Sequence, residues 1–174
     1  MNYRTKTYIA GDWTGDEDAI KQLRQWNESE FYSKLNFVDV HDFVQARDSS
    51  LPCTIKQSLH ERMNMSKNFL LVVGQQIKRL RKGSCQFCKY YDCFMSSCRR
   101  GHPIDNRSYI EYECEQALKY DLNIAVLYNS WVVDRRLCPD VLADEGIHAP
   151  MMSFRNWKLD WDYSSVRDAF LSLL

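Results

Sequence analysis

The chain has 174 residues, with 23 basic and 23 acidic side chains and a formal net charge of +0. This length is enough to bury a core, and the balanced charge gives no general reason to expect nucleic acid or an anionic membrane as partner. No apolar run approaches the roughly 18 residues of a membrane span, so we expect a single domain over residues 1–174 and no membrane partner.

The compartment is indicated by the N-terminus and the cysteines. A short apolar stretch near the start soon meets Asp12 and Asp16, which is not the pattern of a signal peptide. Without an export signal, the seven cysteines favour reduced thiols or metal ligands over a disulfide framework. We therefore expect a cytoplasmic protein.

The first part of the chain predicts two strand-and-helix pairs. A β-rich run over 5–10 ends at Gly11, and apolar residues at helical spacing follow over 16–26. Residues 35–40 predict a second strand, and Pro52 is well placed to begin the next helix.

The continuous apolar run over 69–73, bounded by Gly74, is typical of a strand buried on both faces. Residues 75–104 lack clear periodicity and are rich in cysteine and basic residues, so we interpret them as an insertion in a loop. A helix then begins near Arg107 and leads into a further strand over 123–128.

A weaker strand over 149–154 and an amphipathic helix over 163–174 complete the pattern. The repeated alternation predicts an α/β fold with a parallel sheet of roughly five strands, covered by helices on both faces. Ligands of such sheets bind at the carboxyl ends of the strands, which directs attention to the loops after them.

Three glutamates alternate in the segment YIEYECEQA. Ser108 lies three residues before Glu111, the spacing of a capping box, although a helix start at Asp105 would weaken that assignment. Glu115 lies four residues before Lys119, in the favourable orientation for an ion pair along a helix. Helix stability therefore accounts for two of the three glutamates.

Glu113 has no such role, because the residue four positions later is Ala117. On a helical wheel it lies beside Tyr109, at the margin of an apolar stripe that includes Ile110 and Ala117. A carboxylate at the edge of a core is partly desolvated, which makes it a candidate for function. The alternative is a surface glutamate with a tertiary partner.

The segments LHERMNMSKNFLLVVGQQ and YIEYECEQALKYDLNIAVLY resemble the TIR-like domains of bacterial antiphage systems, the Thoeris TIR proteins in particular. Residues 5–155 fit the layout of that family, which is flavodoxin-like, a three-layer sandwich. The most specific part is 109–117, where the family typically has W-V-x-W/Y-E-I-x-x-A. Glu113 falls on the family's catalytic glutamate, and Tyr109 stands in place of the commoner tryptophan.

The resemblance implies an enzyme that cleaves the nicotinamide–ribose bond of NAD+ and makes an ADP-ribose-derived signal. It implies NAD+ as substrate with no further cofactor, a downstream effector that senses the product, a phage-derived trigger and a homo-oligomer. Two alternatives stay open: a nucleoside 2-deoxyribosyltransferase-like enzyme and a non-enzymatic TIR adaptor. The D-x-G-T-x-x-E motif of the deoxyribosyltransferases is absent ahead of Glu113.

Several residues are expected to bind substrate. Gly11, Asp12 and Trp13 form a loop after the first strand, where the indole is suited to stacking on a base or on nicotinamide. No G-x-G-x-x-G fingerprint of a classical dinucleotide site is present. The other candidates are Tyr109 on the helix, Gly74 after the strand over 69–73, and Asp42 and Arg47 in a loop where TIR domains shape their pocket.

Cys85, Cys88, Cys93 and Cys98 follow the pattern C-x2-C-x4-C-x4-C, with His102 just beyond. The short first spacing suits tetrahedral zinc, which would hold the insertion together. The alternative is a set of reduced structural thiols. The insertion is also basic, but a basic loop on a neutral chain is usually a solvated surface, so we do not expect nucleic acid as a partner.

Overall fold

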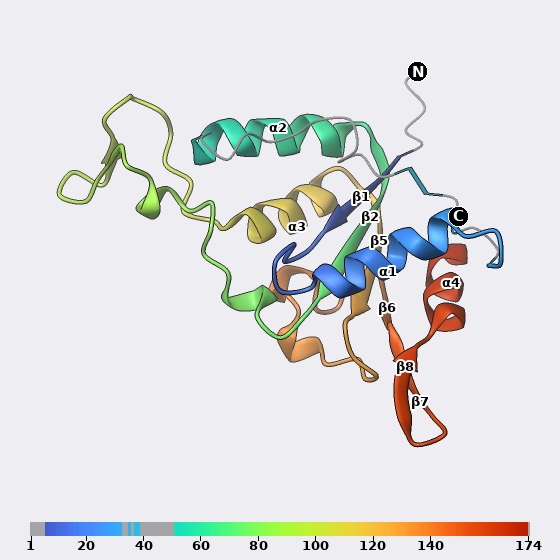
Figure 1. The fold of residues 1–174 in the computed structure, drawn as a ribbon. Helices are drawn as coiled ribbons and strands as arrows, with labels where there is room; N and C mark the ends of the chain where they lie inside the picture. Colours follow the sequence, from blue (N-terminus) through green and yellow to red (C-terminus); the bar gives the residue numbers. More distant parts are fainter. Residues whose placement is uncertain (1–5, 33–34, 36, 39–50, 174) are drawn as a thin grey trace.

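The structure, a computed structural model, describes residues 6–32, 35, 37–38 and 51–173. Its centre is a parallel sheet of four strands in the order β1-β2-β5-β6 (Figure 1). These strands are β1 (Lys6–Ala10), β2 (Ser66–Val73), β5 (Asn123–Tyr128) and β6 (Ile147–Pro150). The two central strands are the most apolar runs of the chain, because both of their faces are covered.

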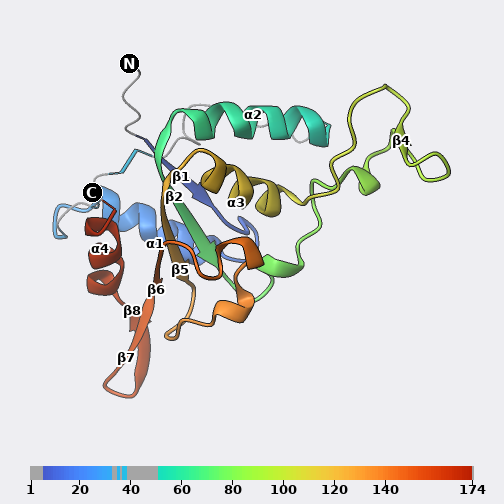
Figure 2. The same cartoon turned by 180° about the vertical axis from the view of Figure 1, so that it is seen from behind.

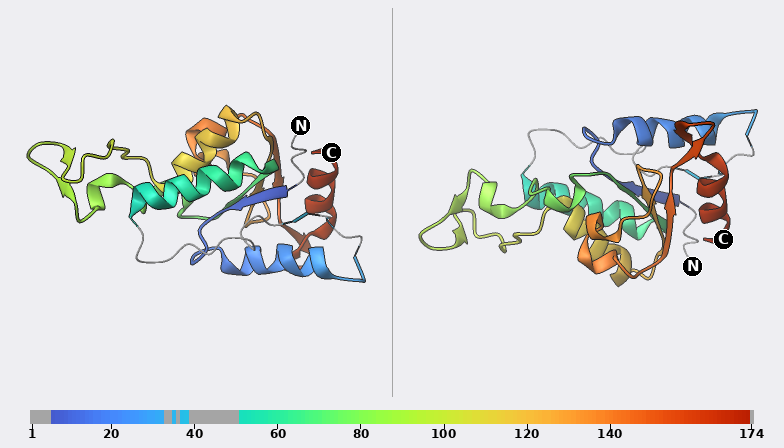
Figure 3. Two further views of the ribbon diagram at one scale, coloured as in Figure 1. Left: turned by 90° about the horizontal axis from the view of Figure 1, so that it is seen from above. Right: turned by 90° about the horizontal axis from the view of Figure 1, so that it is seen from below.

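Helices cover both faces of this sheet (Figure 3). One face carries α2 (Pro52–Asn64) and α3 (Tyr109–Lys119), and the other carries α1 (Glu17–Glu28) and α4 (Tyr163–Leu171). Alternate side chains of a strand point to opposite faces, so each strand contributes to two separate cores. This arrangement confirms the predicted flavodoxin-like sandwich of three layers.

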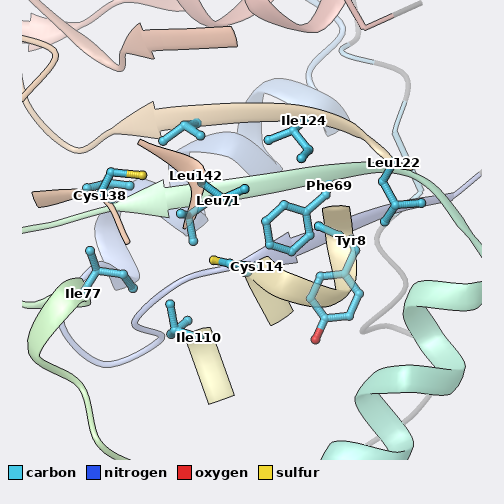
Figure 4. Packing of buried hydrophobic residues seen from close by; sticks show 14 of the residues in the cluster. Tyr8, Phe69, Leu71, Ile77, Ile110, Cys114, Leu122, Ile124, Cys138 and Leu142 are labelled. Atoms are coloured by element: carbon cyan, nitrogen blue, oxygen red, sulfur yellow. The ribbon is translucent and has the colours of Figure 1, made fainter. Parts of the chain in front are cut away.

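The core under α2 and α3 contains the residues that position the site. Tyr8 of β1 stacks on Phe69 of β2, with 5.8 Å between ring centroids. Ile110 and Cys114 of α3 pack against the same cluster (Figure 4). The first turns of α3 are thereby fixed against β1 and β2.

The predicted insertion projects beyond α2 and α3, away from the sheet (Figures 1 and 2). It contains short 3-10 turns at Ile77–Arg79 and Cys85–Phe87 and a small antiparallel pair, β3 (Tyr91–Asp92) with β4 (Ser97–Cys98). Its base returns to the domain, where the Tyr109 amide donates to the Lys82 carbonyl at 2.8 Å.

Two predicted strands differ from the structure. The strand predicted over 149–154 is divided, because β6 ends at Pro150 and β7 (Met152–Arg155) forms an antiparallel hairpin with β8 (Lys158–Trp161). The strand predicted over 35–40 falls largely outside the described residues. Its described positions carry no strand, although the Thr7 amide donates to the Val38 carbonyl beside β1.

None of the described helices is both long and apolar enough to cross a membrane.

Candidate active site

A cleft of about 670 Å³ opens at the carboxyl end of β1, between α2 and α3. This volume is within the usual range of small-molecule and cofactor sites. Four segments line it: the turn at 11–14, one side of α2, the base of the insertion and the first turns of α3. The lining residues are Gly11, Asp12, Trp13, Thr14, Pro52, Ile55, Leu59, Arg62, Leu80, Arg81, Lys82, Gly83, Ser84, Phe87, Tyr109, Ile110 and Glu113.

Glu113 lines this cleft although it is only 6% exposed. The Tyr8 hydroxyl donates a hydrogen bond to Glu113 Oε1 at 2.5 Å. Burial raises the pKa of Glu113 from 4.5 to about 7, against the lowering effects of the Tyr8 hydrogen bond and the nearby positive charge of Arg62. A carboxyl group with a pKa near neutrality in a cleft is a candidate for chemistry.

The start of α3 is held in place by its own sequence. Ser108 Oγ accepts from the Glu111 amide at 3.1 Å, and Glu111 Oε2 accepts from the Ser108 amide at 2.6 Å. This confirms the predicted capping box. The predicted pair of Glu115 with Lys119 is wrong, because Glu115 binds Arg107, which folds back over the helix start.

A buried lysine fixes the segment that leads into α3. Lys56 of α2 is 4% exposed, and its Nζ donates to the carbonyls of Asp105 at 3.1 Å and Arg107 at 2.7 Å. Burial would raise the pKa of the Asp105 carboxyl, but hydrogen bonds from Arg107 and Lys56 lower it to about 2. These contacts link α2 to α3 beside the cleft.

Three positive side chains line the cleft together with Glu113. Arg62 is 3% exposed on α2, while Arg81 and Lys82 are exposed at the base of the insertion. Arg81 lies 3.9 Å from Glu111, a pair that is largely solvent-screened. The cleft therefore combines one buried carboxylate with cations suited to an anionic ligand.

Aromatic rings line the same cleft. Trp13 is 40% exposed, and the Arg24 guanidinium lies 5.2 Å from its ring centroid. Tyr109 also lines the cleft. Burial, followed by the nearby thiols Cys53, Cys85 and Cys88, raises the pKa of Tyr109 to about 12, so its hydroxyl stays neutral.

Residues 8–82 match the family model of Thoeris protein ThsB, TIR-like domain. This segment is similar to a Thoeris TIR-like domain. A comparison with curated proteins found no match. The matched segment covers β1, α1, α2 and β2 and ends before α3 begins, so the role of Glu113 rests on the site and on the resemblance of residues 109–117.

The structure brings five of the predicted site residues to one cleft: Gly11, Asp12, Trp13, Tyr109 and Glu113. Asp42 and Arg47 lie outside the described residues.

Gly74 is not among the residues that line the cleft. It packs instead against the buried Asp16, whose carboxylate accepts a hydrogen bond from the Gly74 amide. A Cβ at position 74 would lie 1.9 Å from Asp16 Oδ1, so only glycine fits. Gly74 therefore serves the close approach of two loops, and it does not line this cleft.

The predicted zinc ligands are not assembled as a set. Cys93 is exposed, whereas Cys85, Cys88, Cys98 and His102 line a small hollow with Cys53. Across the part of the chain that the structure describes, no three His, Cys, Asp or Glu side chains are grouped so that they could hold a metal ion. The seven cysteines are free thiols.

The basic residues of the insertion have partners nearby. Lys78 forms an ion pair with Asp140 at 2.5 Å, and Arg99 lies 3.5 Å from Asp92. The Arg100 guanidinium lies 4.0 Å from the Tyr90 ring centroid. These contacts pair the three basic residues with neighbouring side chains of the insertion and of the domain.

Tyr8, Arg62 and the cleft wall at 80–84 were not predicted from the sequence. Tyr8 and Arg62 approach Glu113 from elements far away in the sequence, whereas hydrophobic periodicity predicts only neighbours on the same element. One signal for Tyr8 was present. A tyrosine in an otherwise apolar buried strand requires a partner for its hydroxyl.

Gly83 is expected to be required for the cleft wall. Its φ is +101°, and a Cβ there would lie 2.5 Å from Cδ1 of the Tyr109 ring. Gly83→Ala should therefore destabilise the fold by about 1–3 kcal/mol and displace Tyr109. Urea unfolding measures this loss.

Gly101→Ala is the matched control, because Gly101 has a φ of +74° with nothing within 4 Å of its Cβ position. It carries the backbone strain without the clash, so its loss should be clearly smaller. Equal losses for the two variants would show that the contact with Tyr109 is unimportant.

Proposed function

We propose that this Thoeris TIR-like domain cleaves the nicotinamide–ribose bond of NAD+ in antiphage immunity. The observation that carries the proposal is Glu113, a buried carboxylate that nevertheless lines a cleft large enough for a small-molecule substrate. Its position on α3 is the one at which the family resemblance implies the catalytic glutamate.

The chemistry requires only one carboxylate. Hydrolysis of an ordinary glycoside takes two, because the leaving oxygen needs a proton. The nicotinamide of NAD+ is already cationic and leaves as a neutral base, so no general acid is needed. The ionised Glu113 then stabilises the positive charge that develops on the ribose, and it accepts hydrogen bonds from the ribose hydroxyls.

The remaining groups of the cleft suit the rest of a dinucleotide. Arg81 and Lys82 lie at its outer wall, where they are suited to bind the diphosphate. Trp13 and Tyr109 offer aromatic rings for a base or for nicotinamide.

The acceptor of ADP-ribose determines the product. Water gives ADP-ribose, an atom of the adenosine moiety gives a cyclic isomer, and an outside amine gives a conjugate. In the proposed pathway the product activates a separate effector, and a phage-derived component triggers the reaction. A homo-oligomer is part of the same proposal.

The test is incubation of the purified protein with NAD+, with and without extract of phage-infected cells. Nicotinamide release, followed by chromatography and mass analysis of the products, measures cleavage and identifies the acceptor. A parallel incubation with deoxynucleosides and free bases tests the deoxyribosyltransferase alternative. Base exchange without nicotinamide release would establish that alternative, and no turnover of either substrate by folded protein would favour the adaptor.

A further inference from the structure

Tyr8 is completely buried, yet its hydroxyl belongs to the active site. Its ring stacks on Phe69 within the core, and Figure 4 shows its hydroxyl oxygen pointing away from the labelled apolar side chains. This hydroxyl donates to Glu113 Oε1 at 2.5 Å. We propose that Tyr8 is a positioning residue that holds the carboxylate of Glu113 in its reactive orientation, an inference that rests on the function proposed for Glu113.

The geometry separates the roles of the two residues. Glu113 lines the cleft, whereas Tyr8 is not among the lining residues and approaches the carboxylate from β1. Tyr8 therefore holds one carboxylate oxygen from within the core. In the proposed reaction, the other oxygen contacts the ligand. A carboxylate fixed in this way does not have to be reoriented in the transition state, which favours catalysis.

The hydrogen bond also affects the charge of Glu113. Burial disfavours the carboxylate, whereas a donor that bonds to the ionised form favours it. The other group that acts on Glu113 from a neighbouring element is Arg62 of α2, and Cys114 is a buried thiol beside it on α3. Asp12, Arg81 and Lys82 are the remaining charged groups that line the cleft.

Tyr8→Phe removes the donor and keeps the ring that packs on Phe69. The pKa of Glu113, followed by NMR of ¹³C-labelled glutamate and assigned with Glu113→Gln, should rise by about one pH unit. At pH 7, kcat should fall on the order of tenfold: about fivefold because a smaller fraction of Glu113 is ionised, and the rest because the carboxylate is less well oriented. Only the first part should recover at higher pH. KM should change less than kcat.

Tyr128→Phe is the matched control. Tyr128 is a buried tyrosine of the same core, and its hydroxyl bonds to His148 Nδ1 at 2.8 Å instead of to Glu113. It should leave the Glu113 titration unchanged. A pKa of Glu113 that is the same in Tyr8→Phe and wild type, or a kcat of Tyr8→Phe equal to that of the wild type at every pH, would overturn the inference.

A second variant keeps the test informative if Tyr8→Phe does not fold. Incorporation of 3-fluorotyrosine at position 8 is nearly isosteric and makes the phenol a stronger donor, so the pKa of Glu113 should move downwards. An unchanged or higher pKa of Glu113 would contradict the proposed role.

The NMR titration of Glu113 does not depend on catalytic turnover. A wild-type protein that does not cleave NAD+ would therefore refute the proposed function, while the titration still tests whether Tyr8 controls Glu113.

Discussion

Glu113→Gln is expected to reduce NAD+ cleavage by about 10³-fold while the protein remains folded. Glutamine has nearly the same shape, and its amide oxygen can still accept the hydrogen bond from Tyr8, so the core around β1 and α3 is preserved. The variant lacks the negative charge that stabilises the oxocarbenium-like ribose, and loss of one such electrostatic group typically costs about 10²–10³-fold in rate. Nicotinamide release at saturating NAD+ measures the effect.

Glu115→Gln provides the control from the same helix. Glu115 is largely exposed and pairs with Arg107, outside the lining of the cleft. It should retain activity close to that of the wild type, because an exposed ion pair contributes little to stability. Full activity of a folded Glu113→Gln variant would remove Glu113 from the mechanism, and equal losses in both variants would indicate a general defect of α3.

Raising the pH through 7 is expected to increase activity and to decrease stability. The pKa of Glu113 is about 7 in the folded protein, because burial disfavours the carboxylate, against 4.5 as the reference value. The ionised form of Glu113 is the catalytic one. We therefore expect kcat to be low near pH 5.5 and to approach a plateau above pH 8, roughly one pH unit or more below and above this pKa.

Stability moves in the opposite direction. Glu113 binds its proton more tightly in the folded protein than in the unfolded chain. The protonated carboxyl therefore makes its full contribution to the free energy of unfolding below about pH 4.5, and this contribution is lost as the pH rises through 7. The difference between the two pKa values corresponds to roughly 3 kcal/mol. Wild type should therefore lose stability relative to Glu113→Gln between about pH 4.5 and 8.

Urea unfolding of both proteins across this range, together with kcat at each pH, tests the two effects. Glu115→Gln should follow the wild type, because it keeps the buried carboxyl. A difference in unfolding free energy between wild type and Glu113→Gln that does not change with pH would show that Glu113 has an ordinary pKa. A kcat that does not change across pH 7 would show that ionisation of Glu113 does not affect the rate-limiting step.

Residues 69–73 and 123–128 illustrate what local patterns can predict. Both are apolar runs bounded by turn residues, and the structure places both at the centre of the sheet. The hairpin of β7 and β8 was not predicted, because its outward-facing residues lack a clear apolar pattern and Asn156 and Trp157 turn the chain with positive φ values of 49° and 62°. A turn of this kind leaves a weak signal when the usual glycine is absent.

The sequence by itself determined the alternation of strands and helices, the capped start of α3 and the choice of Glu113 among three glutamates, because each depends on residues within a few positions of one another. Only the tertiary structure decided that Glu113 is buried against Tyr8, that Arg62 lies nearby, and that the base of the insertion forms one wall of the cleft. Tyr8 and Arg62 are 105 and 51 residues away from Glu113 in the sequence, and the packing of α2 and α3 on the sheet brings them together. The same burial sets the pKa of the carboxyl, a property of its surroundings that no local spacing encodes.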